Sequence, residues 1–307
     1  MKNLPSAIAA LCAFIMLMLF PAAAKNAVIS GLENCGKIII PSLFPFFVAV
    51  NLLSESGLIG SFSRRFGSFR SAAFIIGITG GYPIGADFIA SARKRGEISC
   101  EAASKLLVFC NNSGPAFIIG ALGTGVFSSA YAGILLYASH ILAALIYGRL
   151  FCRVDCAVSA ENEKSLDFSR AFTVSIKKAV NSVLNICGFV LAFSVLISLL
   201  DSRGLLFILG GELSRIFHTE LHFNTALMAG IFELGNSISA MQGLAATPLN
   251  LALAAFVVGW GGISVHFQTF SVIADTDIKT ARYIIGRFLI AIFGAFIAFS
   301  AAVILRI

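Results

Sequence analysis

The chain has 307 residues, of which 58% are hydrophobic and 12% are charged. A soluble domain has about 45–50% apolar and about 25% charged residues, so the composition excludes an ordinary water-soluble protein and predicts an integral membrane protein. The net charge of +7 does not indicate nucleic-acid binding, because membrane proteins carry extra Lys and Arg that orient their loops. No basic face with interleaved aromatic residues is present either.

Nine apolar stretches follow one another along the chain, at residues 6–23, 38–54, 71–92, 103–128, 130–148, 179–200, 223–246, 249–274 and 281–305. The first, with its flanking residues 1–25, predicts either a retained anchor helix or a signal peptide that ends in a run of alanines. Both alternatives place the next residues outside the cytoplasm, so the rest of the topology is the same for either one.

Two of the nine stretches predict re-entrant hairpins rather than crossings. The stretch 71–92 has basic residues at both ends and is interrupted by Gly80, Gly81 and Pro83, which break a helix. Each arm has about nine residues and so about 13 Å of helix, against about 30 Å of hydrocarbon. The stretch 223–246 predicts a second hairpin from the opposite face, with its tip at Gly235, Asn236 and Ser237.

Seven crossings and two hairpins place the N-terminus on the cytoplasmic side of the membrane and the C-terminus on the outer side. Five basic residues then lie outside and the other 17 of 22, Arg287 among them, lie in the cytoplasm; the five are Lys25, Lys37, Arg203, Arg215 and Arg306. This asymmetry agrees with the positive-inside rule. The predicted fold class is an all-α integral membrane protein with broken helices.

An internal duplication is indicated by residues 26–36 and 178–188, which are identical at six of eleven aligned positions, including Cys35/Cys187 and Gly36/Gly188. Each half continues with a hairpin, an interrupted helix and a final helix. We therefore expect a first repeat at 26–150, a cytoplasmic linker at 151–178 and a second repeat at 179–307, inverted relative to the first. Inverted repeats with discontinuous helices are typical of secondary transporters.

Helix breaks in a bilayer expose backbone groups that lipid cannot satisfy, so such breaks must line protein or a watery cavity. We expect four breaks to converge on one binding site, with Pro83 at the first position of a helix and Ser113 capping a helix that begins near Pro115. The alternative is that the polar side chains only satisfy the interrupted backbone. The candidate substrate- or ion-binding residues at the breaks are Gly80, Gly81, Tyr82, Pro83, Asn111, Asn112, Ser113, Gly114, Pro115, Asn236, Ser237, Gly261 and Gly262.

Four further candidates follow the breaks by about one helical turn or precede them: Asp87, Glu233, His266 and Gln268. Ionisable groups inside a bilayer usually mark a path for substrate, ion or proton. Three alternatives remain open: Asp87 pairs with Arg93 or Lys94 at the membrane rim, Glu233 has a structural role, and His266 only packs.

The runs PSLFP at 41–45, GGYPIGA at 80–86, RKRG at 93–96 and NNSGP at 111–115 resemble the YlbJ-type sporulation integral membrane proteins. These belong to a wider group with a nucleoside recognition, or gate, domain that is similar to concentrative nucleoside transporters. The resemblance covers about residues 26–307 and implies a bacterial inner-membrane protein with substrate or ion contacts at 80–83 and 111–115. In this chain Asp87 stands where the family often has a basic residue.

The function that the sequence favours is secondary transport of a small polar solute, nucleoside-like by resemblance, coupled to H⁺ or Na⁺ and serving sporulation. The alternative is a non-transporting membrane scaffold or assembly factor for sporulation. An enzyme is not expected, because no metalloprotease, hydrolase or phosphate-loop motif is present. No cofactor or metal is expected beyond a coupling Na⁺ or H⁺, the lipid bilayer is the expected partner, and homo-oligomerisation is left open.

Overall fold

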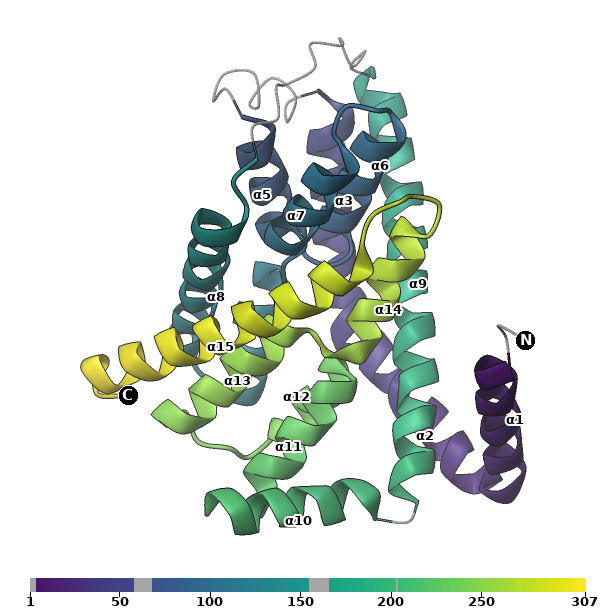
Figure 1. The fold of residues 1–307 in the computed structure, drawn as a ribbon, viewed down its shortest axis with the longest axis vertical. Helices are drawn as coiled ribbons and strands as arrows, with labels where there is room; N and C mark the ends of the chain where they lie inside the picture. Colours follow the sequence, from purple (N-terminus) through teal and green to yellow (C-terminus); the bar gives the residue numbers. More distant parts are fainter. Residues whose placement is uncertain (1–3, 58–67, 155–165, 203) are drawn as a thin grey trace.

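The computed structural model describes residues 4–57, 68–154, 166–202 and 204–307. Within these ranges the chain forms fourteen α-helices and two π-helices and no strand (Figure 1), which confirms the all-α prediction. Four helical segments are apolar and long enough to cross a bilayer: α8 (Ala130–Phe151), α9 (Phe168–Asp201), the pair α13–α14 (Pro248–Ile273) and α15 (Thr280–Leu305). The chain is therefore a multi-pass integral membrane protein.

A fifth candidate span is the pair α1 (Leu4–Leu19) and α2 (Pro21–Asn34) with the π-helix η1 (Cys35–Ile39), which bends by 99° at Phe20. The remaining apolar helices have 10–17 residues and are too short to span about 30 Å alone. These short helices agree with the predicted interruption of membrane helices. The total of seven crossings stays a prediction.

The stretch of the first hairpin is broken where predicted, between α5 (Phe69–Gly80) and α6 (Ile84–Lys94), while its re-entrant path through the membrane stays a prediction. Gly81 has φ +75°, a left-handed conformation that favours glycine. The helix after it starts one residue later than expected, because Pro83 is the N-cap of α6 rather than its first residue.

The interrupted helix of the first half is also confirmed, as α7 (Cys100–Cys110) followed by the π-helix η2 (Ala116–Val126). The predicted cap is wrong, since Pro115 is the N-cap of η2 and no side chain caps it. Ser113 instead donates its backbone N–H to His140 Nε2 at 3.2 Å.

The second hairpin consists of α11 (Leu221–Phe232) and α12 (Leu234–Met241). Its break is at Glu233, which is extended (φ −149°, ψ 126°), and not at Gly235–Ser237, which lie in the first turn of α12. The last break separates α13 (Pro248–Trp260) from α14 (Gly262–Ile273) at Gly261, as predicted.

Three other helices complete the chain. α3 (Ile40–Glu55) contains Pro45. α10 (Leu205–Phe217), which the sequence did not predict, lies below α11 and beside the lower end of α9 in Figure 1. α9 starts at Phe168, so the second half of the predicted linker 151–178 is helical, while residues 155–165 lie outside the described residues.

Glycines allow several helices to meet backbone to backbone. A Cβ on Gly259 of α13 would lie 2.5 Å from the Cα of Ala291 on α15, and a Cβ on Gly123 of η2 would lie 2.5 Å from the Cα of Gly133 on α8. Small residues at helix contacts are the usual means of close packing in membranes. Figure 1 shows α5, α6 and α7 in the upper part of the molecule and α11 and α12 in the lower part, with α15 crossing between them.

Candidate functional site

The four breaks converge in space, as expected from the sequence. A Cβ on Gly81, in the first hairpin, would lie 2.9 Å from the backbone N of Gly114. A Cβ on Gly261 would lie 3.3 Å from the hydroxyl of Tyr82, and one on Gly262 would lie 3.2 Å from the Cα of Glu233. Each break therefore touches at least one other, because glycine lets the backbones approach.

A cavity of about 50 Å³ lies between these breaks. Its polar side is formed by the breaks and by α14, whereas its apolar side is formed by η1, α3 and α9. The lining residues are Ile39, Leu43, Gly81, Tyr82, Ser113, Gly114, Phe117, Ile186, Val190, Glu233, Leu234, Gly235, Val265 and Gln268. A space of this size holds a few water molecules, and it is far below the roughly 300–1,000 Å³ of pockets for drug-sized ligands.

Two nearly buried polar side chains line the cavity, Gln268 at 4% exposure and Ser113 at 1% exposure. On the helix that carries Gln268, the Nε2 atom of His266 is buried and has no hydrogen-bond partner among the described residues. Buried polar groups are nearly always hydrogen-bonded, so this nitrogen is an exception next to the cavity wall.

Glu233, which also lines the cavity, is held by the second hairpin. Its carboxylate accepts hydrogen bonds from the backbone N–H groups of Gly235 (2.8 Å) and Asn236 and from Ser264 Oγ (3.4 Å). The side chain is thus the N-cap of α12. It connects the tip of the hairpin to α14 as well, since Ser264 belongs to that helix.

Beside the cavity lies a buried polar network that is centred on Arg287 of α15, which is 0% exposed. Its Nη1 donates to Asn111 O and Asn112 Oδ1, both at 3.1 Å. Its Nη2 donates to the hydroxyl of Tyr82 and to Val258 O at 3.4 Å. Arg287 is therefore not the cytoplasmic surface charge that the sequence indicated.

Asn111 is the second centre of this network. Its Oδ1 accepts from Ala86 N at 3.2 Å, and its Nδ2 donates to Thr269 Oγ1 at 2.9 Å and to Tyr283 OH at 2.8 Å. The side chain thus joins the first hairpin, α14 and α15. Its hydrogen-bonding groups are occupied, which favours a structural role in this conformation.

The predicted site residues fall into three groups. Those that line the cavity are Gly81, Tyr82, Ser113, Gly114, Glu233 and Gln268. Those that form the breaks or the surrounding network are Gly80, Pro83, Asn111, Asn112, Pro115, Asn236, Ser237, Gly261, Gly262 and His266. Asp87 stands alone, because its side chain is exposed on α6 and does not reach the cavity.

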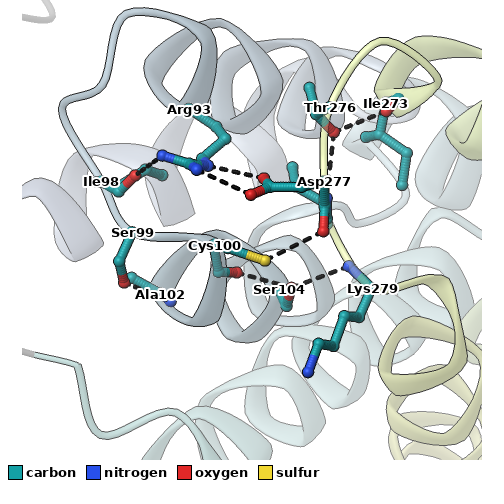
Figure 2. A network of polar contacts seen from close by, with 11 residues as sticks. Arg93, Ile98, Ser99, Cys100, Ala102, Ser104, Ile273, Thr276, Asp277 and Lys279 are labelled. Atoms are coloured by element: carbon teal, nitrogen blue, oxygen red, sulfur yellow. Dashed lines mark hydrogen bonds and ion pairs between the residues drawn. The ribbon is translucent and has the colours of Figure 1, made fainter.

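Arg93 and Lys94 do not pair with Asp87. Arg93 makes two hydrogen bonds of 2.8 Å to Asp277, and Lys94 lies 3.5 Å from Asp275. Figure 2 shows this contact between the end of α6 and the α14–α15 connection, where Lys279 N also donates to Ser104 Oγ at 3.0 Å. It joins the first half of the chain to the second at a distance from the cavity.

The Arg93–Asp277 contact should make the stability of the protein depend on pH in the acid range. The hydrogen bonds from Arg93 lower the pKa of Asp277 from 3.8 to about 2, so its contribution to stability is full above about pH 4 and is lost as the pH falls towards 2. We expect the melting-temperature difference between wild type and Asp277→Asn to be constant from about pH 5 to pH 8 and to vanish at lower pH. A difference that changes between pH 5 and pH 8 would contradict this assignment.

The comparison with known proteins gives one relative at a low level of identity. Sporulation integral membrane protein YlbJ of Bacillus subtilis (strain 168) is 28% identical over 312 aligned residues, which cover 90% of this chain and 76% of the relative. The chain is a distant homologue of YlbJ. No family model and no solved structure matches, so the similarity to YlbJ supports a bacterial, multi-pass membrane protein, while the gate-domain resemblance rests on the sequence motifs alone.

Proposed function

We propose that the protein moves a small polar solute across a bacterial membrane by alternating access, with the converging breaks as its binding site and with a role in sporulation. The observation that carries the proposal is the cavity at the converging breaks, which is lined by the buried polar side chains Ser113, Glu233 and Gln268. Polar side chains and a carboxylate around an enclosed space carry a desolvation cost, and a solute that hydrogen-bonds to them offsets that cost.

The predicted inverted duplication supports the same proposal. Cys35 and Cys187, which occupy equivalent positions in the two repeats, contact each other, as residues on a pseudo-two-fold axis would. The two hairpins lie in opposite halves of the molecule (Figure 1). Transporters with this architecture expose a central site alternately by moving one repeat against the other. The small cavity then corresponds to a closed state, in which the tips must separate before a solute enters.

Flux through proteoliposomes tests the proposal. The purified chain is reconstituted and supplied with labelled nucleosides, amino acids and carboxylates under H⁺ and Na⁺ gradients. For the solute that is transported, we expect Gln268→Leu to lower flux about tenfold, the effect of about one hydrogen bond to a buried polar group. The matched control is Asp87→Asn, which alters an exposed side chain and should leave flux unchanged.

The competing function is that of a membrane scaffold for sporulation partners. It requires no flux above that of empty vesicles for any solute and any gradient, and it requires that Gln268→Leu leaves sporulation unaffected. That combination of results would replace the transport proposal. The cavity volume alone does not favour the scaffold, because a closed transporter also encloses little space.

A further inference from the structure

Arg287 is bound by four oxygens that come from three separate breaks. Tyr82 OH belongs to the first hairpin, Asn111 O and Asn112 Oδ1 belong to the break after α7, and Val258 O lies three residues before Gly261. In the described part of the chain no carboxylate lies within salt-bridge distance of the guanidinium. Arg287 is thus a buried cation that is held by neutral oxygens only.

Carbonyl, amide and hydroxyl oxygens of this kind replace the hydration shell of a metal cation at binding sites. Asn111 and Asn112, which supply two of these oxygens, are among the substrate- or ion-binding residues that the sequence predicted. In the structure a guanidinium occupies them. A side-chain cation and a free cation cannot share one set of ligands, because both need the same lone pairs and repel each other.

We propose that Arg287 is a tethered cation: its guanidinium fills an oxygen-lined cation site between the breaks, holds them in register and excludes Na⁺ from it. The exclusion of Na⁺ deepens the proposed function and rests on it. The occupation of the oxygen site by Arg287 does not rest on the proposed function, because the site is defined by contacts and can be tested by binding alone.

The position of Arg287 in its repeat supports this role. His140 follows Ser113 by 27 residues, Arg287 follows Gly261 by 26, and each is on the last helix of its half. His140 accepts from Ser113 N at its own break. Arg287 contacts its own break through Val258 O and also reaches Asn111 and Asn112 in the other half. One charged side chain therefore connects the broken elements of both halves.

Chemical rescue provides the test. We expect Arg287→Ala to melt about 5–10 °C below the wild type in detergent. About 20 mM guanidinium chloride, far below denaturing concentrations, should restore at least about half of that loss by occupying the vacated site. Urea at the same concentration has a similar shape without charge and should restore nothing. The matched variant is Arg282→Ala, an exposed position on the same helix, which should show neither the loss nor the rescue.

Either of two results with the Ala variant would overturn the proposal. One is an Arg287→Ala protein with wild-type stability, and the other is one that guanidinium does not stabilise more than urea does. If the Ala variant gives no monodisperse protein, rescue is scored as the monodisperse yield after solubilisation with and without guanidinium, with the same criterion. Arg287→Met and Arg287→Lys provide an independent check, because Lys should melt above Met; the reverse order also overturns the proposal.

Addition of Na⁺ tests whether Arg287 excludes a free cation from the site. NaCl should not raise the melting temperature of the wild type relative to choline chloride, whereas it should raise that of Arg287→Ala, because the vacated oxygens are then free to bind it. Na⁺ stabilisation of the wild type that is lost in Asn112→Ala would show that the oxygens accept a free cation beside Arg287, and would refute its exclusion. None of these readouts requires a transported solute, so an absence of flux would count against the proposed function alone.

Discussion

Gly77→Ala is expected to prevent the first hairpin from packing against the end of α7. A Cβ on Gly77 would lie 1.5 Å from the carbonyl oxygen of Cys110, and one on Gly85 would lie 2.3 Å from the same atom. Both contacts are with a backbone atom, so a change of side-chain rotamer cannot relieve the clash. The hairpin would have to move away from the end of α7 and lose the Ala86–Asn111 hydrogen bond. We expect a loss of more than about 4 kcal/mol in the free energy of unfolding.

Melting temperature and monodisperse yield in detergent measure this effect. Gly188→Ala is the matched control, because it is exposed within α9 and nothing lies within 4 Å of its added Cβ. There alanine should be neutral or stabilising by up to about 1 kcal/mol. A Gly77→Ala protein as stable as the control would show that α5 and α7 are not in backbone contact.

Glu233→Gln is expected to disrupt the second hairpin and to abolish transport. The two carboxylate oxygens accept from two backbone N–H groups and from Ser264. Glutamine has one acceptor oxygen, so its NH₂ group would face a donor. We expect a loss of about 2–4 kcal/mol in the free energy of unfolding, since charge-assisted bonds are broken and a buried donor is left unpaired.

The control for this change is Glu220→Gln. Glu220 is the N-cap of α11 in the same hairpin, but its side chain is exposed and makes no capping hydrogen bond. Its replacement should change neither melting temperature nor flux. Wild-type stability in Glu233→Gln would contradict the capping role of the carboxylate.

Breaks that depend on local backbone preference could be predicted from the sequence. Gly80, Gly81 and Pro83 disfavour a helix wherever they occur, and the same holds for the Asn–Ser–Gly–Pro run before η2 and the glycines between α13 and α14. The tip of the second hairpin was misplaced by two residues, because glutamate is a good helix former and carries no local signal for an extended conformation. Asn236 and Ser237 instead begin the helix that Glu233 caps.

The role of Arg287 could not be predicted, because it depends on tertiary contacts. An arginine near the start of an apolar helix usually orients that helix by lying in the cytoplasm. Here the oxygens of Tyr82, Asn112 and Val258 surround it, and they come from positions 205, 175 and 29 residues away. No periodicity or motif connects positions so distant. Asp87 is the opposite case. Its position one turn after Pro83 predicted a place in the site, but its side chain is exposed and does not line the cavity.

The glycine contacts of α13 with α15 and of η2 with α8 bear on how the molecule can deform. Where backbones touch, a displacement of even a fraction of an ångström meets hard repulsion, so each of these two helix pairs should move as a unit. Across the cavity, η1, α3 and α9 present only aliphatic side chains, Ile39, Leu43, Ile186 and Val190, which can exchange rotamers at little cost. We expect any sliding of η1, α3 and α9 against the helices on the other side of the cavity to occur along these aliphatic side chains.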